Sequence, residues 1–242
     1  MYSVALTDVG RKRLVNQDTV YISDVQIGVL PNLYIVADGM GGEKAGDYAS
    51  KSLVGYMLTY IENTMKMPVM AVREAIEYAN ENLFAEGKKN PDLTGMGTTV
   101  VAASIIDNIL HVFNVGDSRC YILDEHGISQ ITKDHSLVEV LVSKGEITRE
   151  SDEYKKNKSK ITRAVGAEEK VLIDSFEVEL TGNEYVLLCS DGLTNMVDDG
   201  KIFNIISSGT GVRSSAKRLI EEANLSGGSD NISILLIDMN AR

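Results

Sequence analysis

The amino-acid sequence predicts an α+β fold, a four-layer αββα sandwich in which two antiparallel β-sheets pack face to face and pairs of helices flank them. Two observations predict it. Short apolar runs of strand length alternate with longer segments whose apolar residues recur every three or four positions, as in amphipathic helices. The helical segments come in pairs, and the strands come in blocks between those pairs. No repeat or linker is visible, so we expect one domain over 1–242.

The first third of the chain combines strands with the first helix pair. We expect strands at 3–7, 19–23 and 33–37, each a short run rich in β-branched or aromatic residues. A helix at 47–62 follows from apolar residues spaced four apart. A second helix is expected from Pro68, because proline suits the first turn of a helix.

The remainder of the chain alternates strands with the second helix pair. Strands at 98–106, 109–115, 119–123 and 127–131 are separated by short turns and are expected to form an antiparallel meander. Later elements are expected as strands at 171–180, 185–190 and 231–237 and as helices at 197–208 and 212–223.

The segment from about 136 to 163 differs from both kinds of block. It contains two short helix-like pieces, a dense charge cluster from 146 to 160 and few large apolar residues. Its position and length suit a mobile flap beside a functional site.

Composition narrows the function classes. The net charge of -11 disfavours broad nucleic-acid binding, because such binding needs many cationic side chains to neutralise phosphates. Cys120 and Cys189 lie in apolar runs and are expected to be buried, reduced thiols. No signal peptide and no apolar run near the roughly 18 residues needed to span a bilayer is present, so we expect a cytoplasmic protein without a membrane partner, most simply a monomer.

Four aspartates share one setting, the end of a strand. Asp38 closes an apolar run and precedes a glycine-rich turn, Asp117 and Asp191 close two later runs, and Asp230 opens the final strand. Each alone fits an ordinary turn residue. If the strands of Asp191 and Asp230 are antiparallel neighbours, these two carboxylates share one edge of a sheet.

Carboxylates forced together repel one another unless cations lie among them. All-oxygen ligands select hard ions such as Mg²⁺ or Mn²⁺ over zinc. Two such ions about 4 Å apart, bridged by a water molecule, would generate a nucleophile near neutral pH. The aspartates therefore suggest hydrolytic chemistry.

Six blocks of sequence, taken in order, resemble the signature blocks of one family. They are Arg13-Leu14-Val15-Asn16-Gln17-Asp18, Asp38-Gly39-Met40-Gly41-Gly42, Gly97-Thr98-Thr99, Gly116-Asp117-Ser118-Arg119, Ser190-Asp191-Gly192 and Asp230-Asn231. The chain resembles the metal-dependent protein phosphatases, the PPM or type 2C family, in its compact bacterial form. The resemblance covers nearly the whole chain and implies a serine/threonine phosphatase.

The resemblance also implies a metal site with two Mn²⁺ or Mg²⁺ ions. Asp38 matches the ligand shared by both ions, and the Gly39 carbonyl matches a ligand of one of them. Asp191 and Asp230 would complete the other ion's ligands, and Asp18 would hold metal-bound water. A hydroxide bridging the ions would then attack phosphorus directly.

Two further roles follow from the same matching. Asp117, with Asp191, matches a position where related bacterial enzymes take a third, weaker ion. Arg13 matches the residue that grips the substrate phosphate, for which its planar fork of donors is well shaped. Asn231 is expected to shape the entry to the last strand rather than to take part in chemistry.

Two residues depart from the family pattern. Many eukaryotic relatives have histidine where this chain has Met40, which cannot protonate a leaving group, so water must do so. Gln17 replaces a glutamate of many relatives; it can still hydrogen-bond metal-bound water but carries no charge. His135 lies in a block that the family also shows and is expected to be structural.

The resemblance implies phosphorylated proteins as substrates and an opposing bacterial serine/threonine kinase as a partner. One alternative within the enzyme class is a phosphatase with a narrow phosphoserine substrate, such as a sporulation or stress-response regulator. The flap would then determine the choice of substrate. Another is an inactive or weakly active module that binds phosphoproteins. A nucleotide-binding role fails, because the glycines from Gly39 to Gly42 complete neither the dinucleotide fingerprint nor the P-loop.

Overall fold

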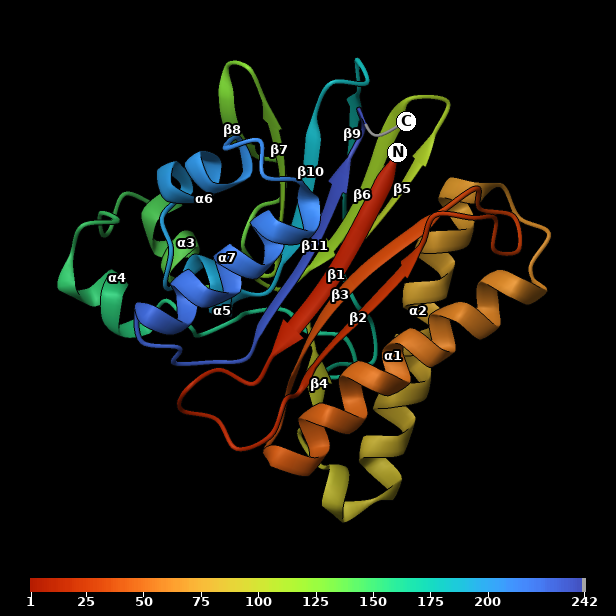
Figure 1. The fold of residues 1–242 in the computed structure, drawn as a ribbon. Coiled ribbons are helices and arrows are strands. Elements are labelled where there is room, and N and C mark those ends of the chain that lie inside the picture. Colours follow the sequence, from red (N-terminus) through yellow and green to blue (C-terminus); the bar gives the residue numbers. More distant parts are fainter. Residues whose placement is uncertain (241–242) are drawn as a thin grey trace.

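Two antiparallel β-sheets form the centre of the protein in the computed structural model, which describes residues 1–240 and, for Glu43, the backbone only (Figure 1). The first sheet has the strand order β1 (Tyr2–Asp8), β11 (Ile232–Asp238), β10 (Tyr185–Cys189), β7 (Arg119–Asp124) and β8 (Gly127–Gln130). The second has the order β2 (Asp18–Ser23), β3 (Leu33–Met40), β5 (Val100–Ile106), β6 (Ile109–Val115) and β9 (Asp174–Glu179), with the short β4 (Gly97–Thr98) paired to the end of β3.

Helix pairs cover the outer faces of the sheets, as the ribbon shows (Figure 1). The second sheet carries α1 (Glu43–Asn63) and α2 (Pro68–Lys89), followed by a 3₁₀ turn, η1 (Pro91–Leu93). The first sheet carries α6 (Asp199–Ile206) and α7 (Val212–Leu225), with the one-turn helix α5 (Asp191–Thr194) at its edge. The expected α+β sandwich of four layers is therefore confirmed.

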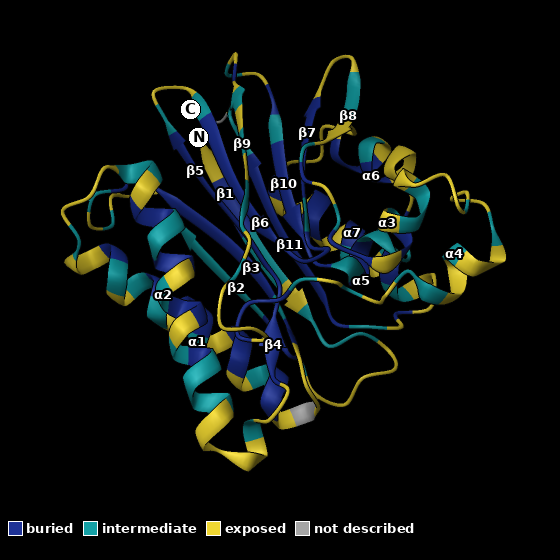
Figure 2. Cartoon of the chain, turned by 180° about the vertical axis from the view of Figure 1, so that it is seen from behind, coloured by how far each residue is buried: buried dark blue, intermediate teal, exposed yellow. Residues whose placement is uncertain are grey.

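Three apolar clusters hold these layers together. One lies between the two sheets and includes Tyr34, Val112 and Leu188, all fully buried. The others lie between each sheet and its helix pair, around Phe113 on one side and Leu219 on the other. Figure 2 shows the result, with buried strands in the middle and exposed residues on the outer faces of the helices.

The expected meander over residues 98–131 is wrong. β5 pairs with β6 in the second sheet, but β7 pairs with β8 and β10 in the first. The turn at Gly116 carries the chain from one sheet to the other. Gly116 has a φ of 105°, and a Cβ atom there would lie 2.6 Å from Thr99 Cγ2, so only glycine fits this crossing.

Other expectations about local structure are confirmed with shifted boundaries. The first helix begins at Glu43 rather than near residue 47, and the charged segment contains the two short helices α3 (Leu137–Ser143) and α4 (Asp152–Asn157). Cys120 and Cys189 are buried free thiols. Among residues 1–240, no helix is both long and apolar enough to cross a lipid bilayer.

Candidate active site

The strand-end aspartates converge at one end of the sandwich. Asp18 opens β2 and is the direct partner of Asp38 across the antiparallel β2–β3 pair. Asp191 directly follows Ser190 at the end of β10, and Asp230 precedes β11, which is antiparallel to β10. A cleft of about 390 Å³ opens here, and its lining includes Arg13, Asp38, Gly39, Asp117, Asp191 and Asp230.

The carboxyl groups of this cleft are difficult to ionise together. Burial, reinforced by the nearby charges of Asp191 and Asp230, raises the pKa of Asp18 to about 7. Burial and the charge of Asp230 raise the pKa of Asp191 to about 6. The pKa values of Asp38 and Asp117 are raised well above the usual range, first by burial and then by their acidic neighbours. Positive charge among these groups would relieve this repulsion.

The oxygen atoms of the site fit divalent cations. Asp18 Oδ1 and Asp191 Oδ1 are buried and have no hydrogen-bond partner in the described part of the chain, residues 1–240. A buried carboxylate oxygen without a partner is costly unless a cation or water satisfies it. Oxygen donors of this type suit Mg²⁺ or Mn²⁺. Within residues 1–240, no group of three acidic, histidine or cysteine side chains is already arranged as a metal site.

The backbone around Asp38 is fixed by the segment Gly97-Thr98-Thr99. The N–H of Asp38 donates to Thr99 Oγ1 at 3.0 Å, and its carbonyl accepts from the Thr99 N–H at 2.8 Å and from Thr98 Oγ1 at 3.0 Å. Gly39 allows α1 to approach, because a Cβ atom there would lie 2.0 Å from the carbonyl oxygen of Gly46. Hydrogen bonds therefore fix both the backbone N–H and the backbone carbonyl of Asp38.

Two residues to which the sequence analysis gave no role orient the other carboxylates. Ser190 Oγ donates to Asp18 Oδ2 at 2.8 Å and accepts from the Ser233 N–H at 2.9 Å. Asn195 Nδ2 donates to Asp191 Oδ2 at 2.8 Å from the turn that follows α5. Asp191 and Asn195 are four residues apart, and side chains with this spacing on a helical turn can contact each other, so the sequence alone could have indicated this pair.

Arg13 lies at the mouth of the cleft and is paired with an acidic residue of the site. Its Nη2 donates to Asp230 Oδ2 at 2.8 Å, and its side chain remains 49% exposed. An exposed guanidinium in this place can reach an anion that enters the cleft.

Gln17 braces the loop beside the cleft, and its expected contact with metal-bound water stays a prediction. Its Nε2 donates to the carbonyl oxygen of Gly42 at 2.7 Å, and its backbone carbonyl accepts from Ser50 Oγ at 2.6 Å. Gly46 makes room for it, since a Cβ atom there would lie 2.0 Å from Gln17 Nε2. The amide therefore fixes the glycine-rich turn that leads into α1.

Asn231 and His135 both stabilise the frame of the site. Asn231 Oδ1 accepts from the Gln17 N–H at 2.8 Å, and its Nδ2 donates to the carbonyls of Val9 and Val15. His135 Nδ1 accepts from the Gly116 N–H at 3.1 Å, next to Asp117. Because Nδ1 accepts, Nε2 carries the proton and lies 3.2 Å from Asp174 Oδ2.

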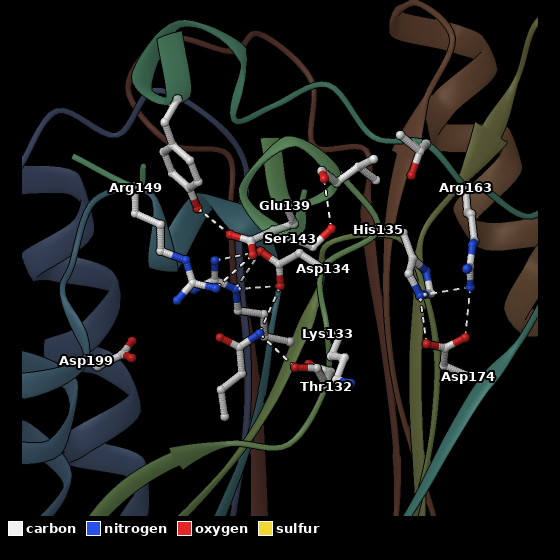
Figure 3. A pocket seen from close by; sticks show the side chains of 15 residues that line it. Thr132, Lys133, Asp134, His135, Glu139, Ser143, Arg149, Arg163, Asp174 and Asp199 are labelled. Carbon is white, nitrogen blue, oxygen red and sulfur yellow. Dashed lines mark hydrogen bonds and ion pairs between the residues drawn. The ribbon is translucent and has the colours of Figure 1, made fainter. Parts of the chain in front are cut away.

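A larger cavity of about 810 Å³ lies between the core and the segment 136–163 (Figure 3). Figure 3 shows Arg149, Glu139 and Asp134 gathered in one group and His135, Arg163 and Asp174 in another. Each arginine that lines this cavity forms an ion pair with an acidic residue: Arg119 with Asp134 at 2.6 Å, Arg149 with Glu139 at 2.7 Å and Arg163 with Asp174 at 2.8 Å. The Arg149–Glu139 pair lies within the segment 136–163, and the Arg163–Asp174 pair joins the end of that segment to β9.

The segment 136–163 also reaches the acidic cleft, because Ser159 and Ile161 line it. Lys158 donates to the carbonyl of Asn195 at 3.3 Å. Its charge lowers the pKa of Asp191, against the larger effect of burial. The segment therefore borders the cleft, and its role as a mobile flap stays a prediction.

Comparison with known proteins decides the family. The family model of protein phosphatase 2C matches residues 9–223. The chain belongs to the protein phosphatase 2C family. Its activity is that of a phosphoprotein phosphatase, a hydrolase.

Individual relatives of this phosphatase match over almost their whole length. The serine/threonine phosphatase Stp of Listeria monocytogenes is 38% identical over 98% of this chain and 96% of its own. The crystal structure of the Mycobacterium tuberculosis serine/threonine phosphatase PstP/Ppp has a TM-score of 0.87, with 33% identity over 99% of both chains. The catalytic domain of PstP in complex with two manganese ions has a TM-score of 0.83, with 33% identity over 98% of this chain and 97% of that domain.

Proposed function

We propose that this phosphatase hydrolyses phosphoserine and phosphothreonine in proteins with the help of divalent cations. The observation that carries the proposal is the convergence of Asp18, Asp38, Asp191 and Asp230 at one end of the sandwich, with two buried carboxylate oxygens that lack a partner. Relatives named serine/threonine phosphatases support the substrate class.

Two Mn²⁺ or Mg²⁺ ions would be held by Asp38, the Gly39 carbonyl, Asp191 and Asp230, and a third would use Asp117 with Asp191. When bound, such ions supply Lewis-acid stabilisation of phosphoryl oxygens and acidify water. The two manganese ions in the related PstP domain support the first two ions of this proposal. The orphaned oxygens of Asp18 and Asp191 support a cation in the same place.

The remaining chemistry belongs to this chain's own side chains. Asp18, held by Ser190, presents its unpaired Oδ1 as an acceptor that orients the attacking water. Arg13, once separated from Asp230, donates two hydrogen bonds to equatorial phosphoryl oxygens and stabilises the charge that develops there. Met40 has no proton to give, so the departing alkoxide takes its proton from water.

The cellular setting is part of the same proposal. A cytoplasmic enzyme of this class would reverse the action of a bacterial serine/threonine kinase. We propose a monomer in which residues 1–242 form one phosphatase domain and residues 136–163 act as a flap that influences substrate choice. Ser159 and Ile161, which lie in the cleft wall, support that role.

The alternative is a module that binds phosphoproteins without hydrolysing them. The two functions separate in one assay, the release of phosphate from a phosphothreonine peptide with Mn²⁺ and with excess chelator. The proposal expects release that depends on metal and disappears in Asp38→Asn. Peptide binding without release in the presence of Mn²⁺ would favour the binding module.

A further inference from the structure

An apolar groove of about 310 Å³ lies directly beside the acidic cleft. Met40 and Ile161 line both the cleft and the groove, so the two spaces share a wall. The apolar part of the groove's lining consists of Met40, Ile161, Ala164, Ala167, Val171 and Leu172. Met40 is 37% exposed and Leu172 is 70% exposed, so apolar surface faces solvent next to the place where phosphate would bind.

The groove is built on a fixed loop. Thr98 and Val165 exchange two backbone hydrogen bonds, at 2.8 and 3.0 Å, which attach the loop to the end of the sheet. Asn80, almost completely buried, accepts from the Gly166 N–H at 2.8 Å and donates to the carbonyls of Glu168 and Glu169. A surface that is already ordered loses little conformational entropy when it binds.

Met40 lies next to Gly97, which has no side chain. The site of a Cβ atom on Gly97 lies 3.6 Å from Met40 Cγ and 3.3 Å from Ala164 Cβ, so the bare backbone of Gly97 lies between Met40 and the loop. This gives a function to a residue that cannot serve as an acid. Its flexible thioether side chain suits contact with apolar groups of varied shape.

The charges around the groove favour neither an acidic nor a basic ligand. Glu168 and Lys170, both exposed, are of opposite sign, and Arg163 is already paired with Asp174. In the larger cavity the arginines are likewise paired, so an acidic group that bound to them would have to break an ion pair. The apolar groove is the neighbour of the cleft that can accept a side chain without such a loss.

We propose that this groove binds an apolar side chain of the phosphoprotein substrate, close in sequence to the phosphorylated residue. The inference rests on the proposed phosphatase function, because that function places a phosphorylated residue in the adjoining cleft. Consecutive Cα atoms are about 3.8 Å apart, so residues next to one held in the cleft lie close enough to reach the wall formed by Met40 and Ile161. Leu172 and Met40 are then specificity-determining residues.

The test uses the full-length protein with Mn²⁺ and phosphothreonine peptides that carry leucine or serine at each of the neighbouring positions in turn. We expect one position at which leucine raises kcat/KM by roughly five- to tenfold, the effect of burying a large part of one apolar side chain. Leu172→Ser should reduce this preference to about twofold or less, since it removes that contact. Leu172→Met should retain the preference because it keeps the apolar surface.

Val25→Ser is the matched control, because Val25 is 71% exposed and follows the end of β2 that lies away from the cleft. This variant should prefer leucine over serine in the peptide as strongly as the unmodified protein does. The inference is overturned if leucine raises kcat/KM at none of the peptide positions. It is also overturned if Leu172→Ser prefers leucine over serine as strongly as the control variant does. Hydrolysis of p-nitrophenyl phosphate, which has no flanking residue, tests the phosphatase function separately. No hydrolysis of it with Mn²⁺ would overturn that function and this inference together.

Discussion

Arg13 Nη2 lies 2.8 Å from Asp230 Oδ2, which links the residue proposed to bind phosphate to a residue proposed to bind metal. A cation bound at Asp230 would compete with the guanidinium for the same oxygen. Loading of the metal would therefore release Arg13 toward the substrate. The arrangement couples the two halves of the site through one carboxylate.

Arg13→Ala should change metal affinity and substrate affinity in opposite directions. Removing the competitor at Asp230 should tighten Mn²⁺ binding by about two- to fivefold, the modest effect of an exposed ion pair. The same change should chiefly raise KM, because the lost contact is made in the bound substrate as well as in the transition state. Titration calorimetry with Mn²⁺ and steady-state kinetics measure the two effects.

Lys12→Ala serves as the control, since Lys12 is an exposed cation in the same loop. It should leave both quantities near those of the unmodified protein. A large fall in kcat at unchanged KM in Arg13→Ala would contradict the phosphate-binding role.

The metal-free protein should lose stability as the pH rises from about 5 to 7.5. The folded-state pKa values of Asp18, about 7, and Asp191, about 6, exceed the ordinary 3.8, so between these values the folded state binds protons that the unfolded state has released. Stability then falls with pH. Thermal unfolding in excess chelator should show a falling Tm across this range.

Asp18→Asn should flatten that dependence, and saturating Mn²⁺ should reverse it because cations then offset the carboxylate charges. Burial lowers the pKa of His135 from its ordinary 6.5, which opposes the fall in this range, but it is one group against four carboxyl groups with raised pKa values. Carboxyl groups with lowered pKa values, such as Glu184, affect stability only at lower pH. A chelated protein whose Tm rises from pH 5 to 7.5 would contradict the described electrostatics.

Asp38→Asn should abolish turnover without unfolding the protein. The substitution replaces a carboxyl group whose ionisation is opposed by burial and by four acidic neighbours, so the Tm of the metal-free form should stay equal or rise. Turnover should fall about a hundredfold or more, because the shared metal ligand is lost. Asp24→Asn gives the opposite pattern, with lower Tm and retained turnover, since Asp24 accepts from Ser3 and Tyr34 outside the cleft. Turnover near that of the unmodified protein in Asp38→Asn would contradict the metal assignment.

His135→Ala should lower the free energy of unfolding by about 1–3 kcal/mol, because the Gly116 N–H loses its buried acceptor. Denaturant unfolding measures this loss. Turnover should decrease only through the displaced turn before Asp117. Unchanged stability with complete loss of turnover would assign His135 a chemical role instead.

The sequence was sufficient to predict the layers and the acidic cluster, because strand-length apolar runs that end in aspartate bring those side chains to sheet edges. It could not assign β6 and β7 to different sheets, since alternation of apolar residues is the same within one sheet and across two. The contact of Gln17 with Gly42 depends on how Gly39 and Gly46 let α1 approach, which no local pattern reveals.

The groove beside Met40 was equally invisible in the sequence. Met40 and Leu172 are far apart in the chain, and they face the same space only because Thr98 pairs with Val165 and Asn80 holds the loop beyond it. Local patterns carry no information about such a long-range contact.

The central claim is that these carboxylates gather around divalent cations. Anomalous diffraction from crystals grown with Mn²⁺ tests it most directly. We expect two peaks about 4 Å apart in the cleft, within ligand distance of Asp38, Asp191 and Asp230. Peaks that are absent from the cleft at saturating Mn²⁺, with the three carboxylates pointing apart, would contradict the account.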